Sequence, residues 1–144
     1  MNWQKEAVND LKSYAARKMS IDNMAEKINE LEQRAIRLGG ISNDTPVLGG
    51  SSKQEEALIN NIAERERLAQ AIDAAQKLIN IIDRGLSVLD PEERKVLDGF
   101  YINRSSRYLD KLCDELHCEK STVYRIKEKA LYKFTVAMYG VVDL

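Results

Sequence analysis

The sequence contains two long stripes of apolar residues at alternating spacings of three and four, separated by a stretch rich in glycine. Spacings of three and four place side chains along one side of a helix, and a stripe this narrow needs a second helix to cover it. The sequence therefore predicts an antiparallel, coiled-coil-like helical hairpin over residues 1–88. The first stripe consists of Ile21, Met24, Ile28, Leu31, Ala35 and Leu38. The second follows Leu58, Ile62, Arg65, Ala69, Ile72, Gln76, Ile79, Ile82, Leu86 and Leu89. Arg65 and Gln76 interrupt its apolar character, and Leu68, Ala75 and Leu78 widen it.

The stretch between the two stripes predicts a flexible Gly/Ser-rich loop over residues 39–53. Four of the seven glycines and one of the two prolines lie here, and both residue types disfavour regular structure. We expect Gly39 to end the first striped helix in the left-handed conformation and Ser20 to cap its start. Residues 3–18 are also helix-like, and the sequence leaves open whether they continue into this helix.

The C-terminal part, residues 89–144, predicts shorter helices and completes an all-α fold. Asp90 is suited to cap a helix that starts at Pro91, where the missing N–H costs nothing. Residues 103–106 should end this helix and offer a serine to cap the next, which is three turns or fewer. A turn at residues 117–119 then leads to a last helix that continues to about Tyr139 and has Val123, Ile126, Ala130 and Leu131 on its inner face. This is the pattern of a helix-turn-helix DNA-binding domain.

The last helix carries a basic outer face. Residues 120–133 contain five cationic side chains and one acidic one, although the whole chain has a formal charge of −1. We expect Arg125 to pair with guanine and Ser121 and Tyr124 to reach bases or phosphates. Three lysines are better placed for phosphates, which fix position without reading sequence: Lys120, Lys127 and Lys129. Together with the outward Glu128, the expected DNA-contacting residues are Lys120, Ser121, Tyr124, Arg125, Lys127, Glu128 and Lys129.

Several segments of the C-terminal part resemble region 4 of sigma-70-type factors over about 45 residues. Leu89-Asp90-Pro91-Glu92-Glu93-Arg94-Lys95-Val96-Leu97 is similar to its opening. Leu112-Cys113-Asp114-Glu115-Leu116, Ser121-Thr122-Val123-Tyr124-Arg125 and Ala130-Leu131 are similar to its helix-turn-helix. A hairpin ahead of such a module is similar to small phage-encoded regulators of the ArpU type. The resemblance implies reading of a promoter element and contact with bacterial RNA polymerase. His117 stands at the turn position that glycine usually fills, so we expect a positive φ there.

Other classes of function find little support in the sequence. It has no phosphate-binding loop, nucleophile elbow or acid–histidine constellation, so we expect no enzyme activity and no cofactor. Cys113, Cys118 and His117 are too few for a metal site, and we interpret the two cysteines as buried, reduced thiols. Neither a signal-type segment nor a run of about 18 apolar residues occurs, which predicts a protein of the bacterial host cytoplasm, away from the membrane.

The sequence thus predicts a sequence-specific transcriptional regulator, phage or prophage encoded, that binds double-stranded DNA. A single module with about four or five phosphate contacts binds weakly at physiological salt, so we expect a homodimer or the help of a partner. Two alternatives stay open. The chain can be a DNA-packaging factor like the small terminase subunit of phages, or an adaptor that binds polymerase and never touches DNA.

Overall fold

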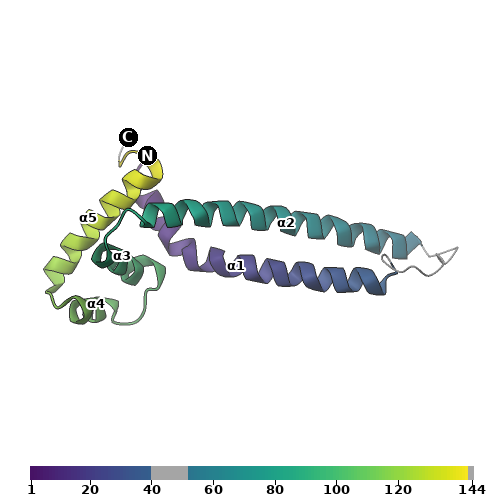
Figure 1. The fold of residues 1–144 in the computed structure, drawn as a ribbon, viewed down its shortest axis with the longest axis horizontal. Helices are drawn as coiled ribbons and strands as arrows, with labels where there is room; N and C mark the ends of the chain where they lie inside the picture. The colour runs from purple at the N-terminus through teal and green to yellow at the C-terminus, as the bar shows by residue number, and fades with distance from the viewer. Residues whose placement is uncertain (40–51, 143–144) are drawn as a thin grey trace. The chain divides into compact units, whose positions relative to one another are not determined.

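The computed structural model describes residues 1–39 and 52–142 of the chain, and within them the predicted all-α fold is confirmed. The two long helices pack antiparallel, and shorter helices follow them (Figure 1). None of the helices in these ranges is long and apolar enough to cross a membrane. In chain order the elements are α1 (Trp3–Arg37), α2 (Ser52–Leu86), α3 (Pro91–Leu97), the π-helical turn η1 (Asp98–Ile102), α4 (Tyr108–Leu116) and α5 (Lys120–Tyr139).

The structure tests the start and the end that the sequence predicts for the first striped helix. Gly39 has a φ of +82° and donates its N–H to the carbonyl of Ile36, so the predicted helix end is confirmed. The predicted start at Ser20 is wrong, because α1 runs without a break from Trp3 to Arg37. This segment contains neither glycine nor proline, and a serine within a helix is easily tolerated. Of the predicted loop 39–53, residues 40–51 lie outside the described residues.

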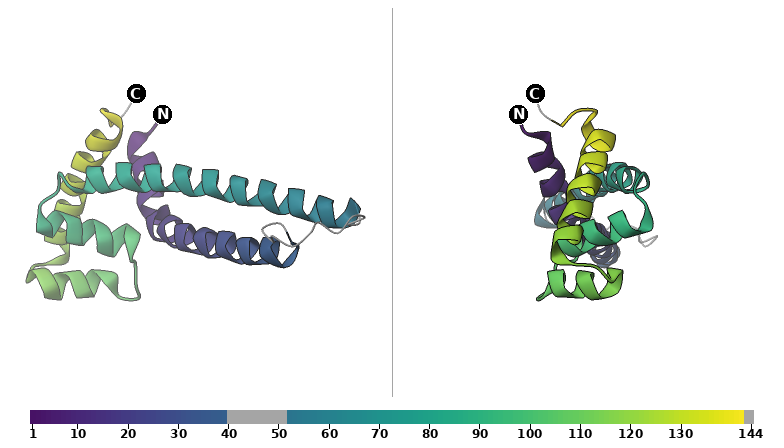
Figure 2. Two further views of the ribbon diagram at one scale, coloured as in Figure 1. Left: turned by 45° about the vertical axis from the view of Figure 1, so that its right-hand side comes forward. Right: turned by 90° about the vertical axis from the view of Figure 1, so that its left-hand side faces the viewer.

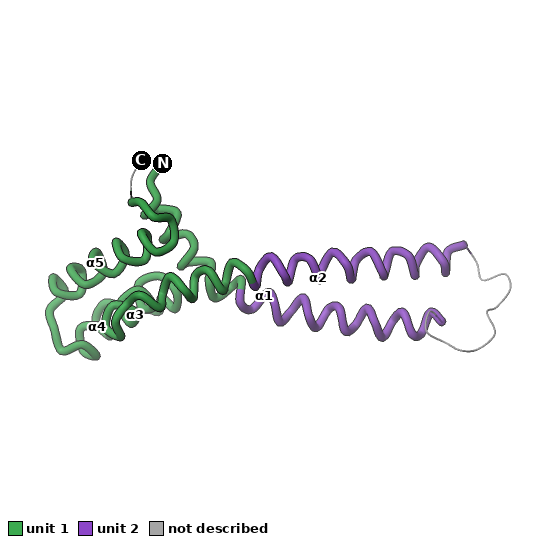
Figure 3. The backbone as a smooth tube through the Cα atoms, turned by 45° about the horizontal axis from the view of Figure 1, so that its top comes forward, with its two compact units in different colours: residues 1–17, 77–144 green, residues 18–76 purple. Residues whose placement is uncertain are grey.

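By its internal contacts the chain divides into two compact units (Figure 3). Unit 1 consists of residues 1–17 and 77–144, and unit 2 consists of residues 18–76. The sequence analysis had expected a boundary between residues 88 and 89. The contacts instead group the beginning of α1 and the end of α2 with the C-terminal helices, a long-range association that apolar spacing along one helix does not reveal.

In unit 2, the line of covered residues on α2 differs from the predicted stripe. Ile62 is 42% exposed, and Ala69 and Gln76 are also exposed, so their assignment to the seam is wrong. The line of covered positions instead follows Leu58, Asn61, Arg65, Leu68, Ile72 and Ala75. Asn61 replaces Ile62 in the seam because its amide donates a hydrogen bond of 2.8 Å to the carbonyl of Leu31. Its own oxygen accepts a hydrogen bond from Arg65. A hydrogen-bonded asparagine at such a position fixes the register of paired helices.

The core of unit 1 combines residues from both ends of the chain. Ala7 and Leu11 of α1 are fully buried in one cluster with Ile82, Leu86, Leu97, Ala130, Leu131 and Phe134. Two hydrogen bonds from tyrosine hydroxyls border it, from Tyr14 to Asp83 and from Tyr139 to Asp10. The first of these raises the pKa of the Tyr14 hydroxyl to about 12. The two ends of the chain also meet in this unit (Figure 2), where the Trp3 N–H donates to the carbonyl of Val142.

The start of α3 follows the prediction and adds a contact to α5. Asp90 caps the helix by accepting a hydrogen bond from the N–H of Glu93, and Glu93 in turn accepts one from the N–H of Asp90. Pro91 occupies the first turn. Glu93 is only 3% exposed, and the same oxygen that caps the helix lies 2.9 Å from the Lys133 ammonium. One carboxylate therefore both begins α3 and attaches it to α5.

The short helix α4 has a left-handed residue at each end. His117 has a φ of 53°, as expected, and Arg107 has a φ of 59°. The predicted serine cap is wrong, because Arg107 occupies the N-cap position without a side-chain hydrogen bond. At the other end, the Cys118 N–H donates to the carbonyl of Cys113, which closes the turn before α5.

Because Leu11 joins α1 to the C-terminal helices, Leu11→Ala should lower the free energy of unfolding by about 2–5 kcal/mol, as expected for a buried leucine. Lys12→Ala changes an exposed neighbour on the same helix and should stay within about 0.5 kcal/mol of the original protein. Denaturant unfolding followed by circular dichroism measures both. Equal stability of the two variants would contradict the placement of α1 in this core.

His117→Gly should raise the free energy of unfolding by about 0.5–1 kcal/mol. Glycine relieves the left-handed strain, and the greater freedom of the unfolded chain offsets only part of that gain. His117 is exposed, so the substitution removes no packing. His117→Ala retains the Cβ atom and should bring no gain. If thermal melting shows the alanine and glycine variants to be equally stabilised, strain at this turn is not the cause.

Candidate nucleic-acid interface

Two helices and the turn between them are supported by one apolar cluster in unit 1. Val96, Phe100, Leu112 and Val123 are its buried members, and they come from α3, η1, α4 and α5 in turn. The helices α3 and α4 both pack against α5 (Figure 2). Because Val123 lies in the first turn of α5 and is fully buried, the opposite side of that turn faces solvent.

Six of the seven residues expected to contact DNA are exposed on α5. They are Lys120, Ser121, Tyr124, Arg125, Glu128 and Lys129, and their spacing places them along one face of the helix. The contact role assigned to each residue stays a prediction. Their common exposure defines what we call the α5 face, a polar and mostly cationic surface over the first half of the helix.

The cations of the α5 face are largely uncompensated. In the described part of the chain, Arg125 and Lys129 form no hydrogen bond or ion pair. Lys120 lies 3.9 Å from Asp110, with both side chains mainly exposed, and such a pair contributes little. The hydrogen bond from the Glu93 N–H is the main cause of the lowered pKa of Asp90, and the charge of Lys129 adds to it without forming an ion pair. Both Arg125 and Lys129 are therefore available to an external anion, such as a phosphate.

Lys127 is the exception among the seven residues, because its side chain is only 16% exposed. Its ammonium lies over the rings of Phe100 and Tyr124 and donates a hydrogen bond to Glu128. Burial lowers the pKa of Lys127, but the hydrogen bond to Glu128 and the nearby Tyr101 outweigh that effect, so the net shift is upward. The lysine stays charged while its charge is already engaged within the protein.

The sequence analysis overlooked a second group of cations, which precede and begin α4. Arg104, Arg107 and Lys111 are all exposed. Arg104 lies 4.3 Å from the centroid of the Tyr108 ring, and Lys111 donates to the Ser105 hydroxyl. None of the three has a carboxylate partner among the described residues. The available signal was three cations within eight residues, at the start of the predicted helix-turn-helix.

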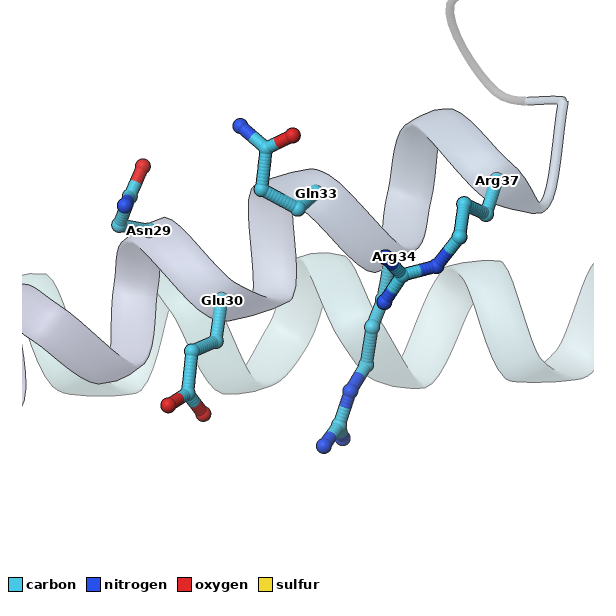
Figure 4. Close-up of a pocket in the computed structure, with 5 residues that line it drawn as sticks. All are labelled: Asn29, Glu30, Gln33, Arg34 and Arg37. Carbon is cyan, nitrogen blue, oxygen red and sulfur yellow. The ribbon is translucent and has the colours of Figure 1, made fainter.

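Two hollows in the described surface differ in character from the α5 face. One of about 210 Å³ lies between η1 and α4, and the ion pair of Lys95 with Glu115, 3.3 Å apart, borders it. The other, of about 360 Å³, lies on α1 in unit 2. Figure 4 shows Glu30 and Arg34 pointing to one side there, and Asn29 and Gln33 to the other. Both hollows mix charges of opposite sign, and neither is a site for one kind of ion.

The chemistry of the remaining reactive groups is modest. Cys113 and Cys118 are free, half-buried thiols, and burial raises the pKa of Cys118. Over residues 1–39 and 52–142, no three His, Cys, Asp or Glu side chains are grouped so that they could hold a metal ion.

Charge is distributed unevenly between the units. Residues 1–17 and 77–144 carry 15 basic and 13 acidic side chains, a net of +2, which leaves −3 for residues 18–76.

Comparisons with known proteins give one match. A search of curated proteins and a search of solved structures found no similar protein. A family model, described as "Protein of unknown function (DUF1492)", matches residues 39–135. The match covers 97 of the 144 residues and includes α2, α3, η1, α4 and most of α5, but not α1. The chain therefore belongs to the DUF1492 family.

Proposed function

We propose that this protein is a sequence-specific, DNA-binding transcriptional regulator that inserts α5 into the major groove. The α5 face would read base edges, and the cations around it would bind phosphates. In this function the two long helices serve as support and as a surface for association. No catalytic step is part of it.

The observation that carries this proposal is the two-sided character of α5. Val123, Ala130 and Phe134 on its inner side are fully buried, whereas Arg125 and Lys129 on its outer side are exposed and form no ion pair with any described residue. A groove-reading helix needs a rigid attachment on one side and free donors on the other. A groove-reading helix must also be held at a fixed angle to its supporting helix, and the tight turn before α5 fixes the angle between α4 and α5.

The resemblance to sigma region 4 and to ArpU-type regulators supports the same proposal and extends it. It suggests a phage or prophage protein of the bacterial cytoplasm that contacts RNA polymerase when bound near a promoter. With Lys120, Lys129 and the three cations near α4, a single copy offers about four or five phosphate contacts, which predicts a salt slope of about −4 for log K against log salt. A homodimer would double this number and read two half-sites about one helical turn apart.

Selection from a pool of random double-stranded DNA, at a stated low salt concentration of about 50 mM, tests the proposal. The full chain should enrich one sequence motif, because Arg125 presents a fork of donors to base edges. The double variant Arg125→Ala/Lys129→Ala is the matched control and should enrich the motif less strongly, with no preference left at the base pair that Arg125 reads. Failure of the original protein to enrich any motif would contradict the proposal.

The two alternative functions predict different outcomes in the same preparation. A packaging factor should form a ring of roughly eight or more subunits, which light scattering would detect as a particle several times the mass of a dimer. An adaptor should capture RNA polymerase in a pull-down while enriching no DNA sequence. A monomer or dimer that enriches a motif excludes both.

On the selected sequence, two exposed cations should behave differently. Arg125→Ala should weaken binding by about 1–3 kcal/mol and relax the preference at one base pair. Lys129→Ala should weaken binding to all sequences alike and reduce the salt slope by about 0.9, because only a phosphate contact is lost. Fluorescence anisotropy over a salt series, on the selected and a scrambled duplex, measures both effects. Both residues are exposed, so melting temperatures should be unchanged. Identical behaviour of the two variants would show that these separate roles are wrong.

A further inference from the structure

Lys127 occupies a position unlike that of the other lysines of α5. Its ammonium nitrogen lies 5.7 Å from the centroid of the Phe100 ring and 5.9 Å from that of Tyr124. Both distances are within the range at which a cation is attracted to the face of a ring. With 16% of its side chain exposed, Lys127 reaches inward to the aromatic rings, whereas Lys129 extends into solvent.

Phe100 connects this lysine to two tyrosines. It is buried in η1, and its ring meets Tyr108 at 5.1 Å and Tyr124 at 5.7 Å, in both cases edge to face. Tyr124 is still 45% exposed. A ring that is fixed on one side by Phe100 and Lys127 loses little freedom when its other side meets a ligand, so it is a preorganised contact.

The charge of Lys127 is compensated within the protein. Glu128 accepts a hydrogen bond from it, and the groups that face it from the neighbouring element η1 are the rings of Phe100 and Tyr101. A phosphate would have to compete with Glu128 and draw the ammonium away from both rings. Lys127 is therefore poorly placed to release a counterion, which is what a phosphate contact requires.

We propose that Tyr124 is a specificity-determining residue that packs against the methyl group of a thymine in the major groove, and that Lys127 is the positioning residue that holds it there. The inference rests on the proposed function. Tyr124 lies between Ser121 and Arg125 on the α5 face, where side chains meet base edges. The thymine methyl is the apolar group exposed in the major groove, and aromatic side chains contact it favourably.

Replacing thymine by uracil removes only this methyl group, so it tests the contact directly. Each thymine of the selected duplex is replaced in turn, and affinity is measured by anisotropy. For the original protein, one replacement should weaken binding by about fourfold, the effect of one buried methyl group. For Tyr124→Ala, the same replacement should have no effect. If no single uracil affects the original protein, Tyr124 does not read a thymine.

Lys127→Met and Lys129→Met form a matched pair that tests the positioning role. Methionine keeps the apolar stem against Phe100 and removes the charge. Lys127→Met should abolish the thymine–uracil difference and leave the salt slope unchanged, and Lys127→Arg should restore the difference. Lys129→Met should keep the thymine–uracil difference and reduce the salt slope by about 0.9. The double variant Tyr124→Ala/Lys127→Met should lose no more discrimination than either single variant.

The outcomes separate the inference from the function on which it rests. If Lys127→Met flattens the salt slope and keeps the thymine–uracil difference, Lys127 is a phosphate contact and the inference is wrong while the proposed function stands. If the original protein selects no sequence, the proposed function fails and this inference fails with it. Thermal melting of each variant shows whether a lost thymine–uracil difference is caused by unfolding. If Lys127→Met is unfolded, the folded Lys127→Arg variant tests the positioning role instead: it should keep the difference, and its loss there would contradict that role.

Discussion

The burial of one side of α5 is the interaction on which the rest of unit 1 depends. Phe134, fully buried, packs in one cluster with Leu11 from α1 and Leu86 from α2. The approach of α2 is so close that a Cβ atom at Gly85 would lie 2.8 Å from the Phe134 ring. Because this side of α5 is covered by α1 and α2, the other side is held in a fixed direction. The availability of Arg125 and Lys129 follows from this attachment.

Glu93 extends the same constraint to α3. It is a buried carboxylate that accepts hydrogen bonds from the Asp90 N–H and the Lys133 ammonium, and its second oxygen has no partner. A buried charge is costly unless it is paired, so the removal of Lys133 would leave an unfavourable group in the core. This pairing links the start of α3 to the second half of α5. The apolar cluster of Val96 and Leu112 then transmits the position of α3 to α4.

Features determined by neighbouring residues could be predicted from the sequence, and features determined by distant ones could not. The Asp90 cap, Pro91, the helix end at Gly39 and the turn at His117 each depend on a few adjacent residues. In contrast, Asn61 lies in the seam of unit 2 because the Leu31 carbonyl, thirty residues away, accepts its hydrogen bond; apolar spacing favoured Ile62. For α5, six of the seven residues expected from residue type and spacing are exposed. The inward direction of Lys127 depends on Phe100, and the widened π-helical turn that carries Phe100 has no signature that we recognised in the sequence.

The two left-handed residues at the ends of α4, Arg107 and His117, show what fixes the direction of α5 relative to α4. With nine residues, α4 is too short to be stable alone, and a glycine at Arg107 or His117 would relieve strain of about 1–2 kcal/mol at each end. The apolar contacts of Leu109, Leu112 and Leu116 must outweigh this strain. Both strained residues lie where the chain changes direction, so the same packing that holds α4 in place also fixes the two turns. The direction of α5 relative to α4 is therefore determined by the core beneath them, and a change in that core should alter the proposed DNA recognition even when every residue of the α5 face is intact.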